Sequence, residues 1–502
     1  LYDEGKIRAI GISNFYVDKV DEDKLVEEAI IKMLAQLDPH STYSDAEEVK
    51  KMNEPLQGNF EGIGVQFQMI EDTLLVVQPV SNGPSEKIGI LAGDRIIAVN
   101  DSAIAGVKMS TEEIMKRLRG PKGSKVNLKI VRRGVQDPLV FTVKRDKIPI
   151  LSLDASYMIQ PKTGYIRINR FGATTAEEFK KAMKELQKQG MKDMILDLQG
   201  NGGGYLNAAI DLANEFLDQK ELIVYTEGRT AKRSDFYAKG NGEFRNGRLI
   251  VLVDEYTASA SEIVSGAVQD WDRGIIVGRR SFGKGLVQRP IDLPDGSMIR
   301  LTIARYYTPA GRCIQKPYDS STDYNKDLIE RFNHGELMNA DSIHFPDSLK
   351  VQTKKLGRTV YGGGGIMPDY FVPIDTTLYT DYHRNLVAKG AVIKFTMKFI
   401  EGHRKELANK YKKFESFNEK FIIDDDMLAT LREMGEKEGV KFNEEQYQKS
   451  LPLIKTQLKA LIARDLWDMN EYFRVMNTTN ESVQKALEIL NSEEYQKKLR
   501  AN

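Results

Sequence analysis

Apolar residues near the start of the chain recur at helical spacing. Over residues 23–37 they fall on one face of a helix, at Leu25, Ala29, Ile30, Met33, Leu34 and Leu37. Asp38-Pro39 is expected to end this helix, because the residue before a proline disfavours helical backbone. A second amphipathic piece, residues 45–52, is expected before Pro55. These patterns predict an N-terminal helical region over residues 1–57.

The pattern changes to strand-like alternation over residues 58–147. GNFEGIGVQFQM is rich in glycine and then places Val65, Phe67 and Met69 on one face. LLVVQPV, DRIIAVN, KVNLKIVRR and PLVFTVKR are typical of further short strands. One helix is expected among them, at residues 110–118. A β-rich module with a single main helix is therefore predicted.

Strands and helices alternate over residues 151–310. GYIRINRF, MILDL and residues 249–253 are strand-like, and helices are expected at residues 175–189 and 206–217. Alternation of this kind indicates an α/β domain with a layered sheet. Beyond it, residues 376–502 carry long charged amphipathic segments, including 446–467 and 482–490, which predict a helical tail with solvated charged faces.

Candidate chemistry gathers in residues 247–288. A run of small residues links the strand 249–253 to a helix expected at 262–271, so Ser259 falls at the helix N-terminus. Free N–H groups and the helix dipole favour negative charge there, and a serine could attack a carbonyl while neighbouring N–H groups hold the oxyanion. Serine is also a preferred helix cap. A cap and a nucleophile both remain open on this pattern.

The glycine run QGNGGG, residues 199–204, follows a strand and precedes a helix, which suits either a phosphate cradle or an oxyanion hole. Residues 278–284 also fit the G-x-x-x-x-G-K pattern. The next residue is Gly285, however, so the hydroxyl that binds Mg²⁺ in a P-loop is missing, and GLVQRPIDL then predicts a strand where a P-loop needs a helix. A P-loop is disfavoured.

Composition limits the classes of protein. The chain has 502 residues, which suggests about three domains, and a net charge of +1, which gives no bulk attraction to nucleic acid or anionic membrane. No apolar run approaches the roughly 18 residues of a membrane span. The single cysteine, Cys313, excludes an internal disulfide and a multi-cysteine metal site, and no HExxH motif is present. We expect no metal, no cofactor and no nucleic-acid partner.

The five histidines lie outside residues 41–333, and no G-x-S-x-G elbow is present. A Ser–His–Asp triad would need a histidine brought in from a flank. A lysine can act as the base when burial lowers its pKa. Lys284, between Gly283 and Gly285, is the candidate.

ILAGDRIIAVNDSAI resembles the central strands of PDZ domains. The segment Gly62, Ile63, Gly64 and Val65 then matches the PDZ carboxylate-binding loop, in which successive backbone N–H groups form a nest for a terminal carboxylate. The alternative is a glycine turn before an edge strand.

TASASEI, SFGKGLVQ, TPAGRCIQ and GIMPD, in this order after LDLQGNGGG, resemble the carboxyl-terminal processing (tail-specific) serine peptidases over about residues 15–375. The resemblance implies a Ser–Lys dyad in which Ser259 is the nucleophile, Lys284 the general base and Gln288 the residue that orients the lysine. It places the oxyanion hole on the backbone N–H groups of Gly203 and Ala260, although Gly202 and Gly203 are equivalent on sequence alone. The family usually has arginine where this chain has Gln199.

The resemblance implies a layered α/β peptidase core of the ClpP/crotonase-like kind with an inserted β-rich PDZ domain and helical N- and C-terminal regions. We expect boundaries at 1–57, 58–147 (PDZ), 148–375 (peptidase core) and 376–502.

The expected function is that of a serine endopeptidase whose PDZ domain captures the C-terminal tails of protein or peptide substrates. The alternative is a non-catalytic PDZ adaptor on a degenerate peptidase scaffold. A homo-oligomer or an adaptor protein is left open as a further partner. Because family members are mostly exported, we expect a periplasmic or cell-envelope location.

Overall fold

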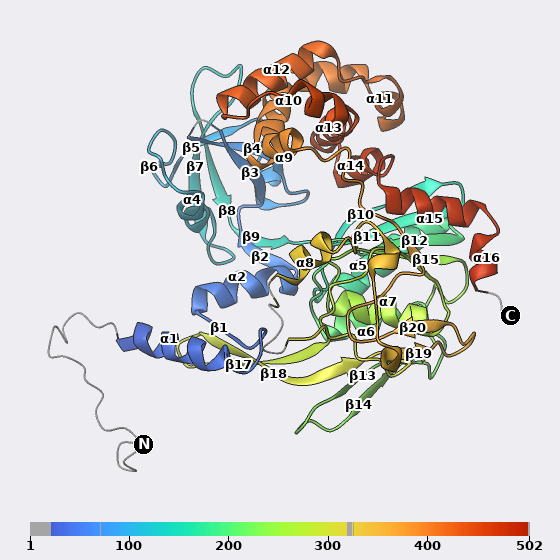
Figure 1. The fold of residues 1–502 in the computed structure, drawn as a ribbon. Helices are drawn as coiled ribbons and strands as arrows, with labels where there is room; N and C mark the ends of the chain where they lie inside the picture. Colours follow the sequence, from blue (N-terminus) through green and yellow to red (C-terminus); the bar gives the residue numbers. More distant parts are fainter. Residues whose placement is uncertain (1–21, 71, 319–323, 325, 500–502) are drawn as a thin grey trace.

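The N-terminal part of the structure is helical and is joined to the rest by a short strand. The computed structural model describes residues 22–70, 72–318, 324 and 326–499 (Figure 1), so residues 1–21 of the expected N-terminal region lie outside it. The elements of this part are α1 (Glu22–Leu34), β1 (Thr42–Ser44) and α2 (Ala46–Gln57).

The prediction that the second helix ends before Pro55 is wrong, because α2 contains Pro55 in its last turn. Proline removes one helical hydrogen bond. Both ends of α2 are capped, however: Asp45 and Glu48 form a capping box, and Gly58 closes the helix in the left-handed conformation with φ 75°. These caps offset the cost of the proline.

The β-rich module is built on a six-stranded antiparallel sheet with the order β3-β4-β5-β7-β8, in which β6 pairs with β5. The predicted strands are confirmed: β3 (Val65–Ile70), β4 (Thr73–Pro79), β5 (Arg95–Val99), β6 (Ser102–Ala103), β7 (Lys125–Val131) and β8 (Leu139–Lys144). The predicted helix is α4 (Thr111–Leu118), which Ser110 caps, and α3 (Pro84–Lys87) is short. Two strands lead into and out of the module, β2 (Asn59–Gly62) and β9 (Asp146–Pro149), and pair with each other.

The central domain contains a second six-stranded sheet, with the order β10-β11-β12-β15-β16-β21. All of its neighbouring strands are parallel except β10, which runs antiparallel to β11. The strands are β10 (Leu153–Gln160), β11 (Thr163–Ile168), β12 (Asp193–Asp197), β15 (Leu249–Val253), β16 (Ile275–Gly278) and β21 (Tyr370–Phe371). The parallel order is what the alternation of strands and helices predicts.

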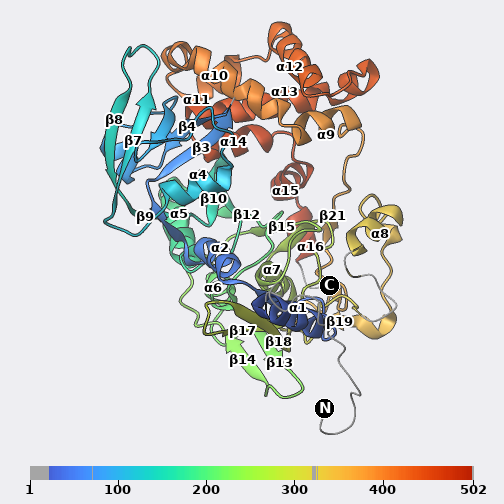
Figure 2. The same ribbon diagram turned by 90° about the vertical axis from the view of Figure 1, so that its left-hand side faces the viewer.

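Helices cover both faces of this sheet (Figures 1 and 2). One face packs against α5 (Thr175–Lys188), α6 (Leu206–Ala213) and α7 (Ala260–Asp270). The helix expected at 206–217 ends at Ala213, and tighter turns follow it, in which the side chains of Asn214 and Glu215 accept from the backbone N–H groups of Lys239 and Glu243. The other face packs against the last helices, α15 (Glu481–Asn491) and α16 (Glu494–Lys498).

A five-stranded antiparallel sheet lies beside the central one. Its order is β1-β18-β13-β14, with β17 also paired to β18. The strands are β13 (Leu222–Glu227), β14 (Ser234–Tyr237), β17 (Leu286–Asp292) and β18 (Met298–Tyr307). The segment after Lys284 is a strand, β17, as GLVQRPIDL predicts, and a P-loop needs a helix there, so the structure excludes a P-loop. The pairing of β1 with β18 holds the N-terminal segment against the central domain.

The remaining elements follow β18. They are α8 (Asp327–Asn333), the hairpin β19 (Lys350–Gln352) and β20 (Thr359–Tyr361), and the helices α9 (Asp381–Ala388), α10 (Ala391–Lys410), α11 (Phe414–Lys420), α12 (Asp425–Lys437), α13 (Glu444–Leu466) and α14 (Met469–Met476). Helices α9 to α13 share a core of their own, and Glu401 of α10 forms an ion pair with Arg95 of the β-rich module (2.8 Å). Within the described ranges, no helix is long and apolar enough to cross a membrane.

Candidate active site

Ser259 lies between β15 and α7, at the turn where the sequence predicts it. Its backbone has φ 57° and ψ −115°, a conformation that is strained for any residue with a Cβ atom. The residues of α7 that follow are all buried, whereas Ser259 is partly exposed. The surrounding structure therefore holds a reachable serine in a costly conformation at a helix N-terminus.

A single buried carboxylate connects Ser259 to the segment that carries Lys284. Oε2 of Glu262 accepts hydrogen bonds from the backbone N–H groups of Ser259 (2.8 Å) and Lys284 (2.9 Å). Oε1 accepts from the N–H of Gly283 (2.7 Å) and from the hydroxyl of Ser281 (2.5 Å). Burial raises the pKa of Glu262, and these four donors act against that rise. The carboxylate thus fixes the two loops relative to each other.

Tyr306 of β18 makes a second connection between the same loops. Its hydroxyl lies within hydrogen-bond distance of the carbonyl oxygens of both Ser259 (3.0 Å) and Lys284. Burial raises the pKa of Tyr306 well above its ordinary value, so the hydroxyl keeps its proton and remains a donor.

Lys284 is partly buried, and its Nζ donates to Oε1 of Gln288 (3.1 Å). The amide nitrogen of Gln288 in turn donates to the carbonyl of His40. Burial lowers the pKa of Lys284, and the charge of Arg300 lowers it further, while Glu262 and Asp38 raise it. In the described part of the chain, no hydrogen bond joins Lys284 Nζ to the Ser259 hydroxyl; the lysine reaches toward Gln288 instead.

The segment before the β-rich module brings one histidine, His40, close to Lys284. The ring of His40 contacts Tyr324, with Nε2 2.7 Å from the tyrosine hydroxyl. Burial lowers the pKa of His40 to about 4, and the charge of Lys284 contributes, so the ring is neutral near neutral pH. Sequence reasoning missed this neighbour because His40 and Lys284 are far apart along the chain.

The glycine loop after β12 lies directly against Ser259. A Cβ atom placed on Gly203 would lie 2.8 Å from the Ser259 Cβ and 2.9 Å from the Ala260 nitrogen, whereas one on Gly202 would meet nothing within 4 Å. The structure thus distinguishes two glycines that the sequence could not. Ala260 is the first residue of α7, and the first N–H groups of a helix have no hydrogen-bond partner within that helix.

The N–H of Gly203 is already engaged. It donates to Oδ1 of Asn201 (2.9 Å), and Nδ2 of Asn201 donates to the carbonyl of Ile168 (2.9 Å). The carbonyl of the same asparagine accepts from the hydroxyl of Ser261 (2.9 Å). Ser261 is fully buried, so this serine serves to hold the loop.

The candidate carboxylate loop lies between β2 and β3 of the β-rich module. Gly64 has φ 73°, and the carbonyl of Ile63 accepts from the N–H (3.1 Å) and the hydroxyl (2.7 Å) of Ser85. β3 is at the end of its sheet. The predicted apolar face of β3 packs on the core that contains Ile114 and Leu118 of α4. A glycine with positive φ and an edge strand thus lie next to each other at this loop.

Three family models match the chain. Peptidase family S41 matches residues 162–322, the PDZ domain matches residues 62–147, and a family of unknown function (DUF8443) matches residues 382–468.

The carboxy-terminal-processing protease of Bartonella bacilliformis is 40% identical over 307 residues, which cover 60% of this chain and 69% of that protein. This chain belongs to the carboxy-terminal processing proteases of peptidase family S41. The carboxy-terminal processing protease CtpB of Bacillus subtilis is 37% identical over 61% of this chain and 64% of that protein, so the chain spans about two thirds of the relatives' length. The photosystem II D1 C-terminal processing protease is 28% identical over 71% of this chain and 84% of that chain, with a TM-score of 0.37.

The resemblance to this family of serine proteases and to PDZ domains is thereby confirmed, as is the mixed α/β fold with a peptidase domain, a PDZ domain and a helical C-terminal region. Within the described residues, no group of three histidine, cysteine or acidic side chains could hold a metal ion.

The sequence pointed to the candidate residues of the protease but missed what connects them. Glu262 follows Ser259 by three residues, and this capping-box spacing was the available signal. Tyr306 and Asn201 had no comparable local signal, because their partners come from other parts of the chain.

We expect Glu262→Gln to lower the free energy of unfolding by roughly 2–5 kcal/mol, because the amide nitrogen would face two buried donors that lose their acceptor. Urea unfolding of the full chain measures this. The matched control is Glu177→Gln, an exposed glutamate in the first turn of α5, for which we expect a change within about 0.5 kcal/mol. Equal unfolding midpoints for the two variants would show that the carboxylate does not hold the loops.

Proposed function

We propose that the chain is a serine endopeptidase that uses a Ser259–Lys284 dyad and selects substrates through their C-termini. The observation that carries this proposal is the Glu262 carboxylate, which binds the backbone of both residues at once. A strained, partly exposed serine and a lysine with a lowered pKa are thereby held on adjoining segments. The family membership supports the same chemistry.

In the proposed mechanism, neutral Lys284 takes the proton of the Ser259 hydroxyl as Oγ attacks the scissile carbonyl. The ammonium so formed then gives a proton to the leaving amine, and water hydrolyses the acyl-enzyme. Gln288 holds the lysine side chain and is itself anchored on the carbonyl of His40. Turnover requires Nζ to swing from Gln288 to Ser259, a motion that a long unbranched side chain permits.

The oxyanion of the tetrahedral intermediate is proposed to bind the N–H of Ala260, with the dipole of α7 behind it. The second donor is the N–H of Gly203, which must leave Asn201 to take part. Gly203 packs directly on Ser259, which places its peptide group beside the proposed nucleophile.

Substrate selection is proposed to occur at the PDZ domain. A terminal carboxylate would bind in the nest formed by residues 62–65, and the tail would add as a strand along β3 with apolar side chains toward α4. Capture raises the local concentration of the tail near Ser259. A periplasmic or envelope location remains part of the proposal and rests on the family resemblance.

Ser259→Ala should abolish cleavage of an unstructured protein, with a loss of about 10⁴-fold or more in kcat, because no other group replaces the nucleophile. Ser261→Ala should retain turnover and lose only about 1 kcal/mol of stability, since its buried hydroxyl donates to the Asn201 carbonyl. The reverse result would reassign the nucleophile. A wild-type chain that binds C-terminal peptides but cuts nothing would instead favour the adaptor.

Activity should rise with pH as Lys284 deprotonates, and kcat/KM measured from neutral pH up to the ordinary pKa of lysine, about 10.4, reports the pKa of the free enzyme. The pKa of Lys284, which is lowered, sets the direction of this pH dependence. At a pH below this pKa the ammonium cannot accept a proton, and at a pH above it the amine can. Lys284→Arg should be as inactive as Lys284→Ala, because arginine stays protonated. Full activity in Lys284→Arg would contradict the dyad.

C-terminal capture is tested with two apolar peptides that differ only in ending as carboxylate or amide, bound to the full chain carrying Ser259→Ala. The carboxylate should bind at least about tenfold more tightly. Gly64→Ala should weaken binding, because its Cβ would lie 2.8 Å from Ile148 Cδ1 at φ 73°. Gly89→Ala is the control, with φ 87° and nothing within 4 Å. Equal affinity of the two peptides would refute capture.

A further inference from the structure

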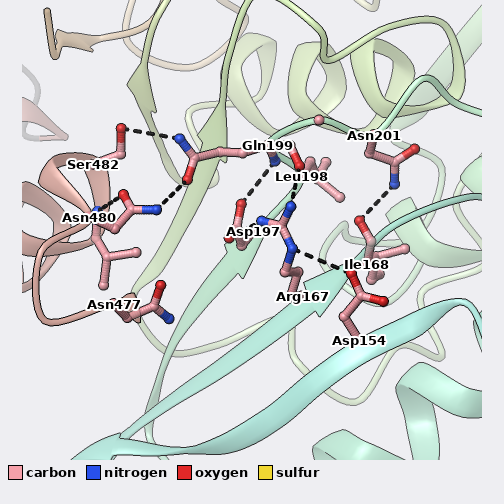
Figure 3. A network of polar contacts seen from close by, with 12 residues as sticks. Asp154, Arg167, Ile168, Asp197, Leu198, Gln199, Asn201, Asn477, Asn480 and Ser482 are labelled. Atoms are coloured by element: carbon pink, nitrogen blue, oxygen red, sulfur yellow. Dashed lines mark hydrogen bonds and ion pairs between the residues drawn. The ribbon is translucent and has the colours of Figure 1, made fainter. Parts of the chain in front are cut away.

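The glycine loop beside Ser259 begins at Gln199, and this side chain points to the C-terminal helices. Figure 3 shows the contacts: Oε1 of Gln199 accepts from Nδ2 of Asn480 (3.1 Å), and Nε2 donates to Oγ of Ser482 (3.4 Å). Both partners are at the start of α15. A residue at the base of the candidate oxyanion loop is thus bound by a segment almost 300 positions later in the chain.

The orientation of this contact is fixed by helix capping. Asn480 is the N-cap of α15, and its Oδ1 accepts the N–H of Val483 (3.2 Å). Only Nδ2 is then free to face Gln199, so the amide cannot be turned around without loss of the cap. The start of α15 therefore presents a defined donor to the loop.

The backbone of Gln199 is held by a second group that also contacts the C-terminal helices. Arg167 of β11 donates to the carbonyl of Gln199 (2.8 Å) and to Asp197 (2.5 Å), and Phe473 of α14 lies over its guanidinium at 4.9 Å. The positively charged guanidinium of Arg167, on the neighbouring strand, thus binds the backbone of the loop. The Gln199 side chain is left to bind Asn480.

The loop between Gln199 and Gly203 is short and offers little freedom. The N–H of Gly200 donates to Asp254 (2.9 Å), and Asn201 is fully buried and binds the N–H of Gly203. A displacement of Gln199 would therefore move the peptide groups that follow it, including the one that faces Ser259.

We propose that the start of α15 positions the oxyanion loop through Asn480 and Gln199, which act as positioning residues. The inference rests on the proposed peptidase function. It makes the C-terminal helices a working part of the active site, since, among the described residues, the hydrogen-bond partners of the Gln199 side chain all lie at the start of α15.

The test uses the full chain with four variants. Gln199→Ala removes both side-chain contacts, and Asn480→Ser keeps a good N-cap but removes the donor to Gln199. Asn480→Asp is the conservative variant, because the cap remains and the Gln199 amide can rotate to donate to the carboxylate. Asn491→Ala is the matched control: it breaks another amide pair between α15 and β10, with Gln160 (3.1 Å), at the far end of the helix.

Gln199→Ala and Asn480→Ser should lower kcat about tenfold with KM changed less than about twofold. The affinity for a peptide aldehyde, which forms a tetrahedral adduct with Ser259, should fall in parallel. Asn480→Asp should retain most of the activity, and Asn491→Ala all of it, at equal melting temperatures. Wild-type kcat in Gln199→Ala and Asn480→Ser, or an equal loss in the control, would overturn the inference.

Hydrogen exchange gives a readout that does not need activity. Backbone amides of residues 198–204, followed by mass spectrometry, should exchange faster in Gln199→Ala and Asn480→Ser than in the wild type or Asn491→Ala. Unchanged exchange would overturn the positioning role. A wild-type chain that cleaves nothing while these exchange differences persist would defeat the peptidase proposal and leave the positioning of the loop standing.

Discussion

The buried Glu262 carboxylate is the interaction on which the candidate site depends. A carboxylate taken out of water is costly, and here four donors from two loops compensate for the lost hydration. Because two of these donors are the backbone N–H groups of Ser259 and Lys284, the same bonds that stabilise the charge set the distance between the two segments. The strained backbone of Ser259 persists because it is held from both sides, by Glu262 at its N–H and by Tyr306 at its carbonyl.

The electrostatics of Lys284 are a balance of opposing effects. Burial and Arg300 favour the neutral amine, while Glu262 and Asp38 favour the ammonium. The N-terminal segment contributes to this balance in two ways, since it supplies Asp38 and also the His40 carbonyl that anchors Gln288. The pairing of β1 with β18 brings that segment into place. Residues before the PDZ domain therefore help to define the surroundings of the lysine.

The C-terminal helices link the two domains. At one end, Glu401 of α10 binds Arg95 and, through its carbonyl, Arg133 of the PDZ domain. At the other end, α15 and α16 cover the second face of the central sheet, and the start of α15 reaches the glycine loop. An open parallel sheet needs apolar cover on both faces. In this chain α5, α6 and α7 cover one face and the last helices cover the other, which places the start of α15 beside the glycine loop that follows β12.

The sequence by itself determined the local elements and the candidate residues. Strand–turn–helix around Ser259, the strand after Lys284 and the alternating strands of the PDZ domain follow from the spacing of neighbouring apolar residues, which the backbone geometry of each element dictates. The tertiary structure determined the contacts between distant parts of the chain, which the spacing of apolar residues does not encode. Gly203 differs from Gly202 only because it packs on Ser259. α2 continues through Pro55 because its ends are capped. The capping-box spacing signals the bond between Glu262 and Ser259, but not the bond between Glu262 and Lys284. Tyr306, His40 and Asn480 meet their partners across tens to hundreds of residues, and such contacts depend on how whole layers pack, so no local pattern could have identified them.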